Sequence, residues 1–347
     1  MRSHSNGLTA NSNEEFDGIG LARAKRDGAN PVVLHDDDQR KLNPNRQRQN
    51  LKAQSRIEIV RVPAWLDLPW LIHGFSTRTG GETTVYRPAQ RAGELNLGFT
   101  ASDPKKTVLA NRKVFVTAVT QNAEAPSLVT LKQIHSSVTY VISKADTGDE
   151  AKRKGDGMMT CKADILLGIQ TADCIPVLIA DRKKRAVAAF HAGWRGTLKR
   201  IVENGIGRMR LEFGSRPEDL IAAIGPGIGA CCYAVGEEVR MEFESQFRYA
   251  PKLFSEVYDA DPVKEKYPML FLTARAPGHS NLGPSLHLDL VEANRRQLLD
   301  SGINAENIYV QGDCTSCRPD RYFSHRAEHG FTGRSLSVIG IRKIKKA

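Results

Sequence analysis

Short apolar runs crowd the middle of this 347-residue chain, and their lengths restrict the fold more than any other feature. They cover residues 128–134, 138–142, 165–170, 176–180 and 186–190. Runs of this length between polar or glycine-containing turns are typical of strands and are short for buried helices. We therefore expect the middle of the chain to form β-sheet.

Helical patterns follow the strands. After the turn at 191–196, apolar residues of the segment 198–209 fall on one helical face. Further helices are expected over 235–247 and 288–299, and strands over 308–311 and 335–341. Hairpin-like neighbours beside crossover helices favour an α+β fold over a doubly wound parallel sheet.

The first 55 residues are rich in Asn, Arg, Gln, Asp and Gly and have no hydrophobic period. We expect residues 1–55 to form a disordered basic tail and residues 56–347 to form one domain, which begins at the alternating run 56–62. No apolar leader and no stretch of about twenty apolar residues is present, which predicts a cytoplasmic protein. Its six cysteines are then expected to be reduced.

The net charge is +11, but the basic residues are scattered or lie in tails such as 342–346. The sequence contains no nucleic-acid recognition motif and no row of aromatic residues interleaved with basic ones. We therefore expect a surface that attracts small anions, with neither nucleic acid nor membrane as a partner. The oligomeric state is left open.

Three metal-ligand side chains stand at the ends of predicted strands, namely His135, Cys174 and His191 (the triad). Their separations of 39 and 17 residues are too wide for a zinc finger but suit three neighbouring strands that meet at one point. One Cys and two His form a permitted ligand set for a catalytic zinc with an open fourth position. The same residues fit a nucleophilic Cys–His pair, and spacing alone does not decide between the two.

Three segments resemble the YfiH/laccase-domain family closely: TADCIPVL at 171–178, HAGWRG at 191–196 and GPGIGACCY at 225–233. The resemblance extends to 73–81, 95–98, 322–326 and 330–334, and it covers roughly residues 56–343. This family was once labelled multicopper polyphenol oxidase and is now regarded as purine nucleoside phosphorylases.

The resemblance implies packed mixed sheets between helical layers, in the order α/β/β/α. It implies that His135, Cys174 and His191 bind one zinc ion and serve catalysis. It also implies phosphorolysis of adenosine, inosine and methylthioadenosine, with inorganic phosphate as co-substrate, together with some adenosine deamination. Ser136 replaces a usual Gly, and Tyr322 and His325 stand where the family often has Phe and Tyr. Ser136 is expected to restrict the approach of the backbone near the metal, and Tyr322 and His325 are expected to shift the substrate preference. None of these departures falls on a proposed ligand.

Three residues are predicted to contact substrate. Arg195 follows His191 by four residues, near a predicted helix start whose N–H groups favour an anion, so we expect it to bind phosphate. Arg78 is a second candidate for binding phosphate, because its side chain is positively charged. Asn96 is a candidate for a hydrogen bond to a ribose hydroxyl. Arg78 and Asn96 could equally tie down turns. For Asp173, a buried structural carboxylate is favoured over a general acid or base.

Other readings of the triad are a Cys–His hydrolase acting on a cell-wall precursor, a polyphenol oxidase, and a basic binding module. Copper oxidation of that kind needs a His-rich set, and the sequence has no His-x-His pair. The basic binding module is the least favoured interpretation, because it gives no reason for the triad to stand at the strand ends.

A second metal is not expected. Cys314 and Cys317 form a CxxC pair, but no second CxxC or His pair follows at a suitable spacing. The adjacent Cys231 and Cys232 are poorly placed to hold one ion together and are expected to be small buried residues.

Overall fold

The computed structural model describes residues 57–87, 93–121, 126–144, 153–257 and 284–343. All of them belong to one compact unit, Pro44–Ala347. The predicted tail at 1–55 lies outside the described residues. Within the described ranges, no helix has the length and apolar character that a membrane crossing needs.

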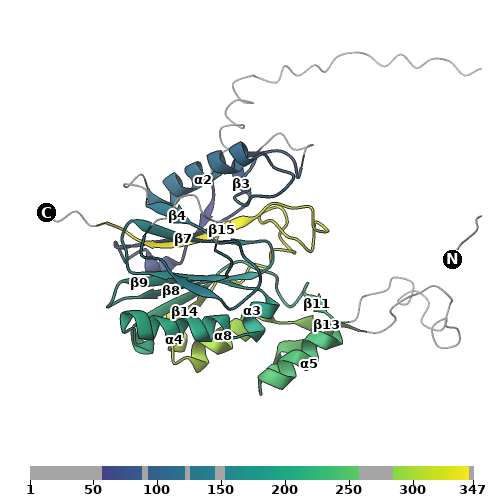
Figure 1. Cartoon of the computed structure of the whole chain (residues 1–347). Coiled ribbons are helices and arrows are strands. Elements are labelled where there is room, and N and C mark those ends of the chain that lie inside the picture. Colours follow the sequence, from purple (N-terminus) through teal and green to yellow (C-terminus); the bar gives the residue numbers. More distant parts are fainter. Residues whose placement is uncertain (1–56, 88–92, 122–125, 145–152, 258–283, 344–347) are drawn as a thin grey trace, which may run out of the picture. The chain divides into compact units, whose positions relative to one another are not determined.

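Two sheets form the centre of the unit (Figure 1). The first sheet contains, in spatial order, β1 (Ile59–Val60), β2 (Leu71–Ser76), β15 (Ser335–Ile341), β7 (Ile165–Thr171) and β4 (Ser127–Val129). The second contains β14 (Ile308–Val310), β10 (Leu220–Ile224), β8 (Ile175–Asp181), β9 (Ala186–Ala192), β6 (Gly157–Thr160) and β5 (Thr139–Val141). A small third sheet contains β11 (Ala234–Val235), β13 (Ser285–Leu288) and β12 (Phe254–Val257), and β3 (Thr79–Thr83) lies apart.

The two large sheets pack face to face over an apolar core. In β7, Ile165, Leu167 and Ile169 point into this core, whereas Leu166 points to the opposite face, as the two-residue period of a strand requires. Leu178 of β8 is among the side chains that meet them from the second sheet.

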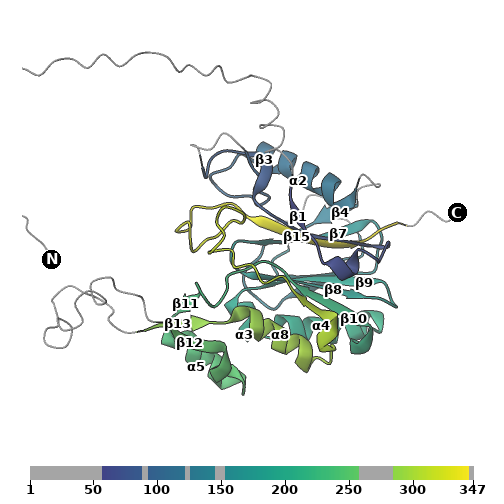
Figure 2. The same cartoon turned by 180° about the vertical axis from the view of Figure 1, so that it is seen from behind.

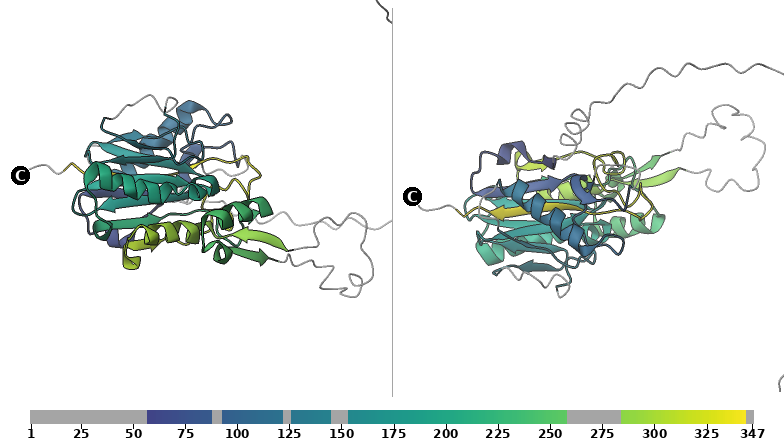
Figure 3. Two further views of the ribbon diagram at one scale, coloured as in Figure 1. Left: turned by 60° about the horizontal axis from the view of Figure 1, so that its bottom comes forward. Right: turned by 90° about the horizontal axis from the view of Figure 1, so that it is seen from above.

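Helices cover both outer faces (Figures 2 and 3). On the first sheet, α2 (Lys105–Thr120) buries Phe115 and Val119 against a cluster that includes Leu336. On the second sheet lie α4 (Ile201–Phe213) and α8 (Leu290–Asp300), whereas α5 (Glu237–Gln246) lies next to the small third sheet (Figures 1 and 2) and joins the same apolar cluster through Val239 and Phe243. The order of layers is thus α/β/β/α, which confirms the predicted fold class. Short 3-10 turns occupy Pro63–Trp65, Pro217–Asp219, Ala250–Leu253 and Ala305–Asn307.

The structure corrects two predicted elements. The helix after the 191–196 turn is two helices, α3 (Trp194–Leu198) and α4, because Arg200 between them takes a left-handed φ of 57°. The strand predicted over 128–134 ends at Val129 as β4. Helix α2 was not predicted from the sequence. Its buried face also carries polar side chains, among them Asn111 and Thr120, which interrupt the helical pattern of apolar residues.

Helix α4 packs so closely on β9 that a Cβ atom at Gly205 would overlap the Phe190 ring. Gly207, on the same helix, has nothing within 4 Å of the corresponding position. We therefore expect Gly205→Ala to destabilise the protein by about 1–3 kcal/mol through overpacking. Gly207→Ala should instead stabilise it by about 0.5–1 kcal/mol, because alanine loses less entropy in a helix.

Urea unfolding of the two variants measures both effects. A stabilised Gly205→Ala variant would show that α4 can move away from β9 at little cost.

Candidate metal centre

The triad lies where the chain passes from one sheet to the other. Strand β7 of the first sheet ends at Thr171 and β8 of the second begins at Ile175, so Cys174 lies in the crossing. His191 is the penultimate residue of β9, directly opposite Pro176 of β8. His135 follows β4 in a loop. Residues from three segments thus meet at one edge of the two packed sheets.

The ligand atoms of the triad all lie within 4.8 Å of one another. The Nε2 atom of His135 is 3.7 Å from the Cys174 sulfur, and the two imidazole rings stand edge to face with their centroids 4.8 Å apart. His191 is buried, Cys174 is partly buried and His135 is exposed. The group is therefore closed on the side of His191 and open on the side of His135.

One buried carboxylate orients two members of the triad. Asp156 has no solvent exposure, and its Oδ1 atom accepts hydrogen bonds from Nδ1 of His191 at 2.8 Å and from the backbone N–H of His135 at 3.0 Å. Its Oδ2 atom accepts from both the N–H and the hydroxyl of Ser136, at 2.6 and 2.7 Å. Ser136 therefore adds a donor to this carboxylate, and these bonds hold His135 in its left-handed backbone conformation (φ 56°).

The sequence does not single out Asp156 as a functional residue. The only local signal is the pair Asp156-Gly157 before a strand, and such pairs are ordinary turn markers.

The triad is electrostatically coupled. Burial pushes the pKa of Cys174 upward, but the charge of His191 and a hydrogen bond with His135 outweigh it and lower the pKa to about 6. Burial likewise opposes the charge on His191, yet the Cys174 thiolate and Asp156 raise its pKa to about 9. Between these values the metal-free protein holds a thiolate–imidazolium pair, and a metal ion must displace the imidazolium proton.

The residues present fit a zinc ion. Nδ1 of His191 is engaged with Asp156, which leaves Nε2 for a metal, the usual arrangement for a ligating histidine. A Cβ atom at Gly193 would lie 2.9 Å from the Cys174 sulfur and equally close to the His135 ring, so glycine keeps the space between the ligands open. One thiolate and two imidazoles leave the fourth tetrahedral position free.

The triad lies in the wall of a cleft with a volume of about 1660 Å³. Cationic side chains are frequent among its described lining residues, namely Lys105, Arg112, Lys113, Lys132, Arg195, Arg326 and Arg334. Aromatic rings of Trp194 and Tyr233 also line it. The cleft thus combines a metal-ligand set with positive charge and flat apolar surfaces.

Arg195 is exposed in this cleft, and its guanidinium lies 4.3 Å from the centre of the Trp194 ring. No carboxylate of the described residues forms an ion pair with Arg195, so its charge faces the cleft. Because α3 has only five residues, the phosphate prediction rests on the guanidinium itself and not on a helix dipole.

Arg78 and Asn96 do not line the cleft. Arg78 is 1% exposed and donates to the carboxylates of Glu94 and Glu328. Asn96 is fully buried and binds Asp103 and the backbone N–H of Arg334. In this structure both residues therefore tie loops together, and their predicted substrate contacts stay predictions.

Asp173 also has a structural environment. Its carboxylate accepts from the Thr315 hydroxyl at 2.6 Å and from the backbone N–H of Arg326 at 2.7 Å. With a φ of 87°, Asp173 takes a backbone conformation that these bonds hold in place beside Cys174.

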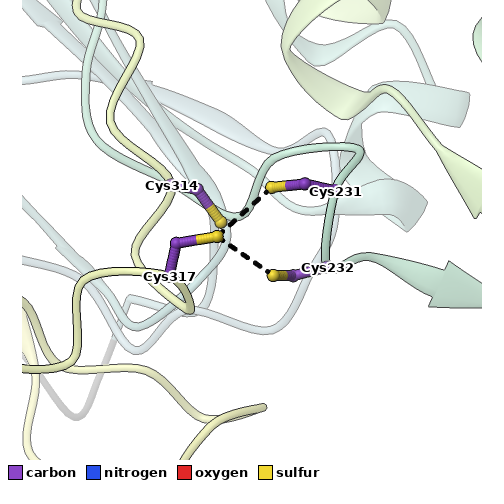
Figure 4. Close-up of side chains that lie close together, drawn as sticks. All are labelled: Cys231, Cys232, Cys314 and Cys317. Atoms are coloured by element: carbon purple, nitrogen blue, oxygen red, sulfur yellow. Dashed lines mark hydrogen bonds between the residues drawn. The ribbon is translucent and has the colours of Figure 1, made fainter. Parts of the chain in front are cut away.

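The structure overturns the expectation for the remaining cysteines. Cys231, Cys232, Cys314 and Cys317 (the cysteine cluster) bring their sulfur atoms within 4.8 Å of one another (Figure 4). Cys231 is exposed and Cys232 is partly exposed, so they are not the buried small residues that were predicted. In the sequence, only the two short Cys motifs point to this cluster. The two motifs lie about 85 residues apart, so only the tertiary structure brings their cysteines together.

Removing the negative charge of Asp156 tests its role. Asp156→Asn keeps the size but replaces one acceptor oxygen with an amide that cannot accept from the loop at 134–136. We expect the affinity for a divalent metal to fall about 10- to 100-fold, as for other groups that orient metal-bound histidines. Zinc titration against a competing chelator measures this change, with the exposed Asp67→Asn as the matched control. Equal affinities in the two variants would contradict the assignment.

The lowered pKa of Cys174 predicts a pH profile for the metal-free protein. Alkylation of Cys174 by iodoacetamide should reach half its maximal rate near pH 6, because the thiolate is the nucleophile and forms above the pKa. An ordinary thiol titrates near about 8.5. Mass spectrometry of the modified peptides reports the rate, with the exposed Cys161 as an internal reference. A midpoint above pH 8 would rule out the thiolate–imidazolium pair.

Comparison with known proteins finds a family model and several related enzymes. A family model for multi-copper polyphenol oxidoreductase laccase matches residues 72–342. The chain is 30% identical over 279 residues to the purine nucleoside phosphorylase YlmD of Bacillus subtilis, covering 79% of this chain and 89% of that protein. It is 29% identical over 228 residues to an adenosine deaminase from an unknown prokaryotic organism, covering 64% of this chain and 78% of that protein.

Among solved structures, the YfiH protein of Bacillus licheniformis superposes with a TM-score of 0.67 at 29% identity, covering 84% of this chain and 98% of that one. The fold and the matched sequence therefore agree with the predicted resemblance. The chain belongs to the multi-copper polyphenol oxidoreductase laccase family, which includes the YfiH-like proteins.

Proposed function

We propose that this protein is a zinc-dependent purine nucleoside phosphorylase, which converts adenosine, inosine or methylthioadenosine and phosphate into the free base and the ribose 1-phosphate. The observation that carries the proposal is the triad in the wall of a cation-lined cleft, because its three ligands would leave a fourth position open on a tetrahedral ion. The relatives named purine nucleoside phosphorylase support the same assignment.

The reaction transfers the nucleoside C1′ from nitrogen to oxygen. A phosphate oxygen bonds to C1′ as the bond from C1′ to the purine nitrogen breaks, and the base leaves with the electron pair and gains a proton. A bound zinc ion supplies Lewis-acid stabilisation of charge on an oxygen ligand.

The chain's own residues have two tasks in this scheme. Arg195 binds phosphate, because its guanidinium offers several donors to phosphate oxygens and is held on the Trp194 ring. The aromatic side chains of the cleft, among them Tyr233, offer faces on which a purine can stack.

Deamination of adenosine is a second candidate activity, favoured by the relative named adenosine deaminase. It needs attack of water at C6 of the purine in place of phosphate at C1′. A zinc ion with an open position supports this chemistry as well, because it lowers the pKa of bound water.

Two of the rival interpretations, a Cys–His hydrolase and a polyphenol oxidase, have less support. A Cys–His hydrolase would use the same thiolate–imidazolium pair without metal, and a chelator would leave it active. A multicopper oxidase needs several His-rich sites. Among the described residues, only two groups could hold a metal, and the triad is the only one that contains histidine.

A direct test follows hypoxanthine release from inosine with and without phosphate. We expect base release that depends on phosphate and on zinc in the wild type, and none above background in Cys174→Ala. Base release in the absence of phosphate would show that the reaction is hydrolysis and not phosphorolysis. Ammonia release from adenosine would identify deamination as a further activity.

The phosphate contact has its own test. Arg195→Met should raise the KM for phosphate about 10- to 100-fold, because a charge-assisted hydrogen bond contributes about 1.5–3 kcal/mol. Lys199→Met removes one charge from a nearby residue outside the cleft lining and should leave this KM unchanged. Equal effects of the two variants would show that general charge, and not a contact, attracts phosphate.

A further inference from the structure

We propose that the cysteine cluster binds one zinc ion, at a site separate from the triad and structural in character. None of its four residues belongs to the cleft lining, and the proposed phosphorolysis makes no use of them. Four thiolates with tetrahedral placement are the ligand set of a closed structural zinc site, in which no position remains for substrate.

The sulfur positions suit one small ion. The Cys317 sulfur lies 3.4 Å from that of Cys231 and 3.3 Å from that of Cys232 (Figure 4). Sulfur atoms on one tetrahedral zinc are about 3.8 Å apart, because each Zn–S bond is about 2.3 Å long. These two distances would need to lengthen by only a few tenths of an ångström to admit the ion, and all four sulfur atoms lie within 4.8 Å of one another.

The sheet topology delivers the two Cys pairs side by side. Strands β10 and β14 are parallel neighbours, so the segments that follow them leave the same edge of the second sheet. A backbone bridge between Gly227 and Cys314 continues this pairing beyond the strands. The chain then turns after Gly229, whose carbonyl accepts from the N–H of Cys232 at 3.0 Å. This turn is what lets two adjacent cysteines approach the same partner.

The backbone around the cluster is suited to thiolates. The N–H of Gly229 donates to the Cys314 sulfur at 3.2 Å. A Cβ atom at Gly229 would lie 3.3 Å from the Cys231 sulfur and 3.6 Å from that of Cys314, so a glycine at this position leaves room beside the sulfurs. Donors aimed at a sulfur, and space kept free beside it, are features of a ligand site more than of an apolar core.

A disulfide explains the arrangement less well. Both Cys231 and Cys232 approach Cys317, but only one of them can form a disulfide with it. The other and Cys314 would then remain as thiols packed against the bridge. A single ion engages all four sulfurs at once, and no oxidant is required.

The cluster is linked to the triad through one residue. Thr315 lies between the two cysteines of the CxxC turn, and its hydroxyl donates to Asp173, the residue before Cys174. Its backbone N–H donates to Gly227, and the N–H of Ile228 donates to the carbonyl of Asp173 at 2.8 Å. An ion that fixes the CxxC turn thereby fixes the strained segment that presents Cys174.

Metal content of the full-length protein, purified without chelator, tests the proposal. We expect two zinc ions per chain in the wild type, one in Cys317→Ser and one in Cys174→Ala. Cys161→Ser, which removes an exposed cysteine elsewhere, is the matched control and should retain both. One zinc in the wild type that survives Cys317→Ser would overturn the proposal. One zinc that survives Cys174→Ala but not Cys317→Ser would support it and refute the zinc requirement of the proposed phosphorylase.

Two further measurements keep the test valid if Cys317→Ser fails to fold, because neither of them uses that variant. Native alkylation with mapping by mass spectrometry should modify Cys161 at once and the four clustered cysteines only after a strong chelator removes the metal. Cobalt substitution should give the intense sulfur-to-metal absorption of a four-thiolate site, retained in Cys174→Ala. Immediate modification of all four thiols, or a native disulfide that includes Cys317, would overturn the proposal.

Discussion

The carboxylate of Asp156 is the interaction on which the candidate centre depends. It is fully buried, and burial alone would favour its neutral form, but hydrogen bonds from His191 and Ser136 lower its pKa to about 2. Because it is ionised and surrounded by donors, it can hold the loop after β4 and the end of β9 at a fixed separation. Without this acceptor the buried Nδ1–H of His191 would lose its partner, at a cost of about 1–3 kcal/mol, and the partly buried N–H groups of residues 134–136 would lose theirs.

The second constraint is the crossing between the sheets. Cys174 can reach the two histidines only because the chain leaves β7 and enters β8 within three residues, which forces Asp173 into a left-handed conformation. The hydroxyl of Thr315 and the N–H of Arg326 bind the Asp173 carboxylate and so offset this strain. The geometry of Cys174 therefore depends on segments more than a hundred residues later in the chain.

Much of this architecture could be predicted from the sequence, and the limits have physical reasons. The strands β7, β8, β9 and β15 match their predicted ranges within a residue or two, because continuous apolar runs mark strands that are buried on both faces. The triad was singled out at strand ends, although only the family resemblance favoured zinc over a Cys–His pair. Asp156 and the cysteine cluster were not predicted, because their roles arise from contacts between segments that only the folded sheets bring together.

The two chemical readings of the triad have one electrostatic origin. Cys174 is partly buried, and its thiolate needs a positive partner, which in the metal-free protein is the proton on His191. A divalent ion held by the triad would replace that proton with a larger charge. Metal binding at neutral pH would then be an exchange of one cation for another within a site that Asp156 has already oriented. The same pair that resembles a hydrolase nucleophile would thus also be the preorganised form of a metal site, and under either chemistry the open side at His135 would face the substrate.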